Sequence, residues 1–210
     1  MTEASFVHLH NHSEFSLLDG AARIEAMAGR AAELGMPAIA LTDHGVMFGT
    51  LDFYEACVRH GVKPIIGVEA YVAPGTRFER APGENEEKYR HLTVLARDEV
   101  GYRNLLRLVT DAHLEGFYHR PRIDKDLLAE RAEGLIGLSG CLAGETCRML
   151  LASDRLETSG DPISVIAPSL GYESESAFST AFKRVMGCSP RQYSRRLETD
   201  APAQGEREAA

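Results

Sequence analysis

The sequence predicts an α/β domain followed by a small all-α unit. Up to about residue 147, short apolar runs alternate with amphipathic helical patterns, which is typical of a parallel α/β fold and favours a barrel. From residue 148 onwards the apolar spacing is helical throughout. All eight histidines lie in the first part. We therefore expect domains at 1–146 and 147–198, followed by a disordered tail at 199–210.

Each expected element has its own signal in the sequence. Apolar residues at helical spacing predict helices over residues 21–34, 51–60, 101–112 and 124–131 of the first part. Short apolar runs predict strands over residues 38–41, 64–68, 92–96 and 135–139. In the second part, the same reasoning predicts helices over residues 148–158, 163–170, 175–186 and 191–197.

Composition narrows the class of protein. The 210 residues are 44% hydrophobic and 26% charged, as in globular proteins rather than disordered chains. The net charge of −8 divides into −7 for residues 1–147 (15 Lys and Arg, 22 Asp and Glu) and −1 for residues 148–210 (8 and 9). No apolar run reaches the roughly 20 residues that span a bilayer, and the four cysteines form no CxxC pair. We expect a cytoplasmic protein without a membrane partner.

Histidines and carboxylates follow the predicted strands. His10 and His12 are two residues apart, so in an extended segment both imidazoles lie on one face. His44 and Glu69 each stand where a predicted strand ends, the position at which parallel α/β folds gather working residues. Imidazole and carboxylate are common ligands of transition metals, and the pattern therefore predicts a metal site. Polar residues on an edge strand are the alternative interpretation of the His-x-His pair alone.

Four motifs resemble the amino-terminal PHP (polymerase and histidinol phosphatase) domain of bacterial DNA polymerase III alpha subunits. They are HLHNHSEFSLLDG at 8–20, LTDHG at 41–45, IGVEAYV at 66–72 and LSGCLAGE at 138–145. The resemblance covers about residues 5–145 and implies a distorted β/α barrel with up to three zinc, manganese or iron ions. Transferred position by position, it implies Asp43 in the second shell and the metal ligands His10, His12, Asp19, His44, Glu69, His91 and Cys141.

The resemblance implies phosphoester hydrolysis, with 3′–5′ exonuclease activity or a purely structural role in polymerases. The family completes its site with a later Asp-x-His pair, whereas no histidine follows His119 in this sequence. Without this later pair we expect a truncated barrel. The polymerase palm, fingers and thumb are also missing, so we do not expect the chain to polymerise DNA by itself. DNA and replication proteins are the partners that this resemblance implies.

The second part is similar to the carboxyl-terminal helix-turn-helix of AraC-type transcription regulators. The similarity covers about residues 148–197 and is carried by ISVIAPSLGYESESAFSTAFKRVMGCSPRQY at 163–193, with 175–186 as the recognition helix. Phe178, Phe182 and Val185 are expected to face the core. The residues that we expect to contact DNA bases or phosphates are Ser176, Ser179, Thr180, Lys183, Arg184, Arg191, Arg195 and Arg196.

Two functional hypotheses follow from the two parts. The first is a DNA-associated, metal-dependent phosphoesterase or exonuclease resembling the polymerase PHP domain. The second is a sequence-specific DNA-binding regulator with a vestigial barrel. A chain in which neither part folds stably is the third alternative, because both parts are incomplete. The join near residues 146–148 fits either a gene fusion or a misjoined sequence.

Overall fold

The structure is a computed structural model. It describes residues 6–80, 89–139, 144–159, 161–172 and 174–200, with only the backbone of residues 145, 146 and 196–200. The described residues up to Gly144 form one compact unit, and those from Glu145 onwards form a second. The expected fold class, α/β followed by a small helical unit, is confirmed. No helix in the described part of the chain is long and apolar enough to cross a membrane.

A mixed sheet forms the centre of the first unit. Strand β1 (Ala38–Leu41) pairs in parallel with β2 (Lys63–Val72), which also pairs in parallel with β4 (Arg122–Ile123). Strand β3 (Arg90–Ala96) runs antiparallel to both β2 and β5 (Leu135–Leu138).

The expectation of a parallel sheet is therefore wrong for β3. Parallel neighbours need a crossover of a dozen or more residues, usually a helix. The described part of the connection after β2, residues 73–80, contains no helix. The following strand instead returns alongside β2 in the opposite direction.

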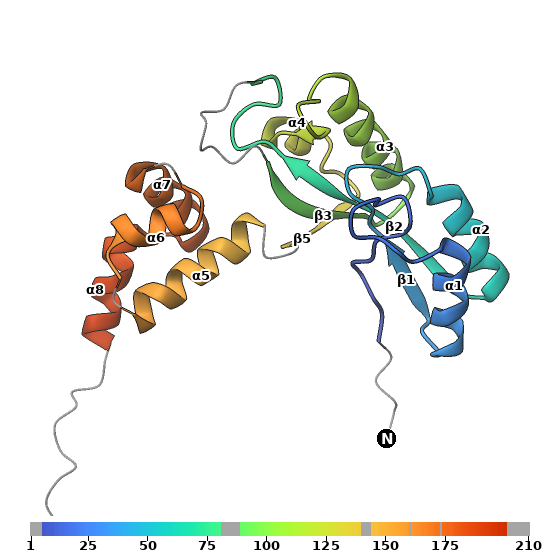
Figure 1. Ribbon diagram of the computed structural model, residues 1–210, viewed down its shortest axis with the longest axis horizontal. Helices are drawn as coiled ribbons and strands as arrows, with labels where there is room; N and C mark the ends of the chain where they lie inside the picture. The colour runs from blue at the N-terminus through green and yellow to red at the C-terminus, as the bar shows by residue number, and fades with distance from the viewer. Residues whose placement is uncertain (1–5, 81–88, 140–143, 160, 173, 201–210) are drawn as a thin grey trace, which may run out of the picture. The chain divides into compact units, whose positions relative to one another are not determined.

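Helices cover the sheet in two groups (Figure 1). Helices α1 (Ile24–Glu33) and α2 (Thr50–His60) pack against β1 in a core that contains Ala28, Phe53 and Leu41. Helices α3 (Glu99–Leu114) and α4 (Lys125–Glu130) pack against β2 and β3 in a second core. Each of these two helices is preceded by an aspartate whose carboxylate caps it by accepting a backbone N–H of the first turn, Asp98 and Asp124 respectively.

The histidine segment lies alongside β1 without forming a regular strand. The backbone N–H of Ala40 donates to the carbonyl of His8, and that of Thr42 donates to the carbonyl of Asn11, both at 2.9 Å. The side chain of Asn11 also donates to the carbonyl of Ala40 at 3.0 Å. These bonds fix which residues of the segment lie beside which residues of β1.

The second unit consists of four helices around one core. They are α5 (Glu145–Thr158), α6 (Ile163–Ser169), α7 (Glu175–Met186) and α8 (Pro190–Asp200). Gly171, at φ 78°, lies in the turn between α6 and α7, and the hydroxyl of Ser174 caps α7 by accepting the N–H of Ala177. Phe178 and Phe182 are fully buried, as expected.

Val185 differs from the expectation, because 38% of it is exposed. Near the end of α7 it is Met186 that packs against the core in its place.

We predict that Phe182→Ala destabilises the second unit by about 3–5 kcal/mol, because the substitution leaves a cavity in a core that cannot fully close. Val185→Ala, on the same helix, should change its stability by less than about 1 kcal/mol. Urea unfolding followed by far-ultraviolet circular dichroism measures both. Equal losses for the two variants would contradict the packing described for α7.

Candidate metal centre

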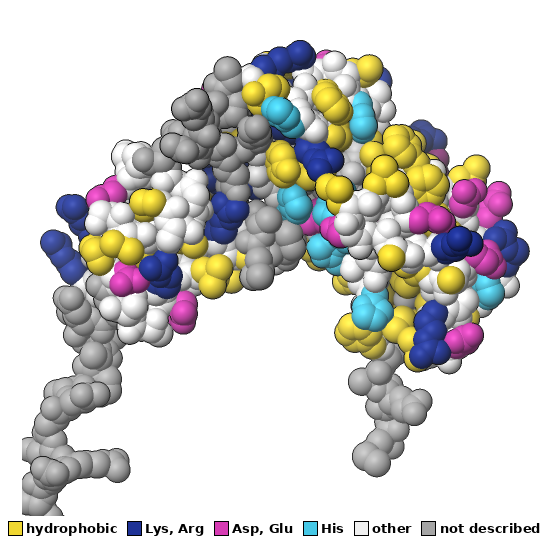
Figure 2. Space-filling model, viewed as in Figure 1, with side chains coloured by type: hydrophobic (Ala, Val, Ile, Leu, Met, Phe, Trp, Pro, Cys, Tyr) yellow, Lys and Arg dark blue, Asp and Glu magenta, His cyan; other side chains and the backbone are white. Residues whose placement is uncertain are grey.

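Four imidazoles from three segments converge on the carboxylate of Glu69, which is 1% exposed. Its Oε2 lies 3.3 Å from Nε2 of His10, 3.2 Å from Nε2 of His12 and 2.9 Å from Nδ1 of His44. Its Oε1 lies 2.9 Å from Nδ1 of His91. Figure 2 shows histidine side chains beside acidic ones on this face of the first unit.

Strand pairing explains why these residues meet. His44 follows β1 and forms a parallel bridge with Glu69, so both lie at the carboxyl edge of β1 and β2. His91 stands at the start of β3 and is paired with Tyr71, two residues beyond Glu69. Because β3 is antiparallel to β2, the beginning of β3 lies at the same edge as the end of β2.

Asp19 extends the cluster towards solvent. Its Oδ2 lies 2.8 Å from Nε2 of His44, and 54% of the aspartate side chain is exposed. The hydrogen bond with His44 lowers the pKa of Asp19. The close contact with the carboxylate of Glu69 outweighs burial and raises the pKa of His44.

Glu69 is an anion in this environment. Burial opposes its ionisation, but the close imidazoles of His12, His44 and His91 outweigh burial and hold the pKa of Glu69 well below its usual range. The cluster is therefore a buried negative charge surrounded by imidazole nitrogen atoms.

The donor atoms fit divalent metal ions. Among the described residues of this cluster, four buried atoms make no hydrogen bond of acceptable geometry, although Oε2 of Glu69 lies within 3.3 Å of three imidazoles: His10 Nε2, His12 Nδ1, His44 Nδ1 and Glu69 Oε2. Buried polar atoms are almost always hydrogen-bonded, so unpartnered atoms that converge on one place indicate a ligand. Three groups have ligand atoms that all lie within 4.8 Å of one another: His10–His12–Glu69, His12–Asp19–His44 and His44–Glu69–His91.

Asp43 supports the cluster from behind. It is 1% exposed, and its carboxylate accepts hydrogen bonds at 2.7 Å from the backbone and hydroxyl of Ser13 and from the hydroxyl of Ser16. The hydroxyl of Ser16 in turn accepts the backbone N–H of His44 at 3.1 Å. Asp43 thus ties the segment that follows His12 to the strand end that carries His44.

The remaining predicted site residues fall into two classes. Cys141 lies outside the described residues, and so does the side chain of Arg196. The other residues expected to bind DNA lie on α7 and α8, where all are exposed except Ser179, which is half-buried: Ser176, Ser179, Thr180, Lys183, Arg184, Arg191 and Arg195. Sequence reasoning missed the roles of Ser13 and Ser16, although both lie within the first histidine motif.

Comparison with known proteins gives these two units their families. Residues 8–173, more than half of the chain, match the PHP domain family. The chain belongs to the PHP domain family. Residues 156–194 match the bacterial regulatory helix-turn-helix proteins of the AraC family. Both resemblances seen in the sequence are thereby confirmed.

The curated relatives of this PHP chain include DNA polymerase III alpha subunits. That of Treponema pallidum (strain Nichols) is 52% identical over 157 residues, and that of Thermus aquaticus is 50% identical over 159 residues. These matches cover 75% and 74% of this chain but only 13% of each relative. Among solved structures, an amidohydrolase from Chromobacterium violaceum matches with a TM-score of 0.37 and 19% identity, over 97% of this chain and 59% of that one.

We predict that Asp43→Asn weakens metal binding by about 10- to 100-fold, because an amide in place of one carboxylate oxygen cannot accept all three hydrogen bonds that position the ligands. Competition with a zinc-binding dye measures the affinity. Asp52→Asn, an exposed substitution of the same type on α2, is the matched control and should bind zinc like the unmodified chain. Equal affinity in both variants would show that Asp43 does not support the site.

Proposed function

We propose that the PHP unit is a metal-dependent phosphoesterase that acts on the ends of nucleic acids. The observation that carries this proposal is the set of three ligand groups. His12, His44 and Glu69 each belong to two of these groups. Shared ligands bring neighbouring metal ions close together, and paired ions are a recurrent device of phosphoester hydrolysis.

Residues of the chain would hold zinc, manganese or iron ions, up to three of them. The ligands proposed are His10, His12, Asp19, His44, Glu69 and His91, together with Cys141 as a prediction from sequence. When bound, such ions lower the pKa of a water molecule and neutralise charge on the phosphoryl group. Hydrolysis adds this water to phosphorus and releases the ester oxygen as an alcohol.

The protein residues contribute orientation and charge. Glu69 stays ionised beneath the imidazoles, so the floor of the site is anionic and favours cations. Asp43 fixes two of the ligand segments through its carboxylate. The names of the polymerase relatives support nucleic acid as the substrate and replication proteins as partners, and both belong to this proposal.

We predict that His12→Ala lowers the metal content of the purified chain and reduces phosphoester hydrolysis at least about 100-fold, because His12 belongs to two of the three ligand groups. Elemental analysis and hydrolysis of a single-stranded oligonucleotide measure these effects. His60→Ala is the control, since His60 lies on the surface beside Glu25 at 2.8 Å. Unchanged metal content and unchanged hydrolysis in His12→Ala would contradict the proposal.

We also propose that the second unit binds duplex DNA. Helix α7 buries Phe178 and Phe182 while it exposes Thr180, Lys183 and Arg184. An exposed polar face on the second helix of a helix-turn-helix is suited to the major groove. Arg191 and Arg195 on α8 are also exposed and suit phosphate contact.

We predict that Lys183→Ala with Arg191→Ala weakens duplex binding and reduces the slope of log affinity against log salt by about 0.9, because the substitutions remove the phosphate contact of Arg191. Fluorescence anisotropy at several salt concentrations measures the slope. Arg103→Ala, an exposed substitution on α3 of the first unit, is the control. A slope that stays the same in the double variant would exclude the phosphate contact of Arg191.

A further inference from the structure

A loop after α3, residues 117–121, lies against the metal centre. Gly45 follows the ligand His44, and a Cβ atom on Gly45 would lie 2.9 Å from both Tyr71 and Pro121. This close approach holds only because Gly45 has no side chain and adopts φ 64°. The loop is therefore packed onto the residue that adjoins a metal ligand.

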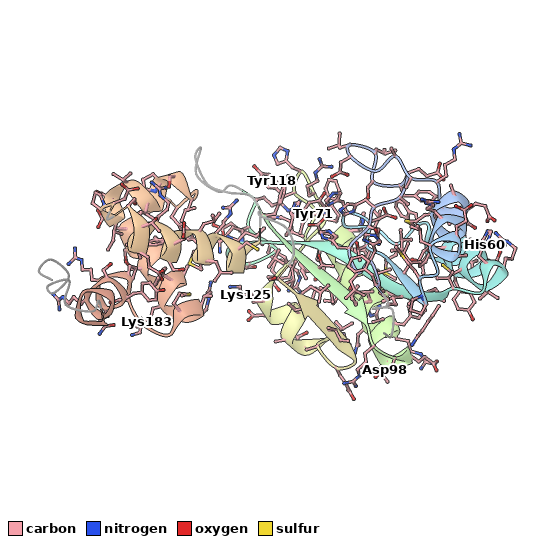
Figure 3. All side chains as sticks on the ribbon, turned by 90° about the horizontal axis from the view of Figure 1, so that it is seen from below. His60, Tyr71, Asp98, Tyr118, Lys125 and Lys183 are labelled. Atoms are coloured by element: carbon pink, nitrogen blue, oxygen red, sulfur yellow. The ribbon has the colours of Figure 1, made fainter. Side chains whose placement is uncertain are left out.

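The loop places Arg120 beside Tyr71, a neighbour of this centre. The guanidinium carbon of Arg120 lies 5.8 Å from the centre of the Tyr71 ring. The Tyr71 ring in turn lies 5.2 Å from the ring of His91 and 6.0 Å from that of His44. Figure 3 shows Tyr71 and Tyr118 on the same side of the unit. The Tyr71 ring therefore neighbours both Arg120 and two of the proposed metal ligands, His44 and His91.

Arg120 differs from the other two arginines around it. Arg77 forms ion pairs with Glu115 and Asp124, and Arg122 donates to the backbone carbonyls of Gly116, Arg77 and Glu79. Among the described residues, Arg120 has no carboxylate within ion-pair distance, and its side chain is half-buried. A half-buried guanidinium without an anion is available for one.

The backbone that carries Arg120 is held in an uncommon conformation. His119 has φ 59°, and no other non-glycine residue in the described part of the chain has a positive φ. The N–H of Tyr118 donates to the carbonyl of Arg120 at 3.0 Å and closes this tight turn. Strained backbone of this kind persists where the surroundings enforce it, and it clusters at ligand-binding sites.

We propose that Arg120 binds a phosphate of the substrate, namely the phosphate one nucleotide away from the phosphoester at the metal centre. The planar guanidinium offers paired N–H donors that match phosphate oxygens. Its position beyond Tyr71 places it outside the ring of metal ligands, where a neighbouring phosphate of a nucleic-acid strand would lie. The substrate class is therefore a chain of phosphodiesters rather than an isolated phosphate ester. This inference rests on the proposed phosphoesterase function.

The test compares two substrates in the full chain loaded with Mn²⁺. A short single-stranded oligothymidylate contains neighbouring phosphates, whereas the p-nitrophenyl ester of thymidine 5′-phosphate contains one. Arg120→Gln should lower kcat/KM for the oligonucleotide roughly 10- to 100-fold, the value of a charge-assisted hydrogen bond, and leave the single ester within about twofold. Arg120→Lys should restore part of the loss. Arg107→Gln, an exposed substitution on α3, should change neither rate.

Each result has a definite meaning. Equal losses on the two substrates, or no loss on either, would overturn the role of Arg120. If the unmodified chain binds Mn²⁺ but hydrolyses neither substrate, the phosphoesterase proposal fails by itself. Arg120 is then judged by the Mn²⁺-dependent anisotropy of labelled oligothymidylate, where Arg120→Gln must weaken binding at least about tenfold to support the inference, and unchanged binding overturns it.

Discussion

A buried anion determines the arrangement of the PHP unit. The carboxylate of Glu69 is 1% exposed, and a charge at such depth is stable only with compensating groups around it. Four imidazoles approach it from the segment before β1, from the end of β1 and from the start of β3. Glu69 therefore links parts of the sheet that are distant in sequence. The same convergence leaves buried nitrogen and oxygen atoms without hydrogen bonds, which a packed core alone would not tolerate.

A second buried carboxylate makes this arrangement rigid. Asp43 accepts three hydrogen bonds from Ser13 and Ser16, and Ser16 holds the backbone of His44. Removal of that network would free the loop that carries Asp19 as well as the segment that carries His12. The centre thus has one carboxylate that faces the imidazoles and one that fixes the backbone segments that carry them.

Local patterns in the sequence predicted a large part of this site. The period of two predicted that His10 and His12 act together, and strand ends predicted His44 and Glu69. Periodicity does not encode the direction in which a strand pairs, and His91 reaches the site only because β3 is antiparallel to β2. The position of Arg120 beside Tyr71 depends on contacts between residues far apart in the chain, which no local pattern records. The exposure of Val185 likewise follows from where α7 ends against its core.

Packing also decides where the helical unit begins. The PHP match extends to residue 173 and the AraC-type match begins at residue 156, so the two matches overlap over residues 156–173. In the structure, Met149 and Leu156 of α5 and Ile166 of α6 share one core with Phe178 and Phe182. The guanidinium of Arg148 also donates to the carbonyl of Leu170 at 3.0 Å. Because α7 would expose its aromatic residues without α5, the helices from Glu145 onwards form one compact unit, and the described residues of 156–172 belong to it rather than to the sheet.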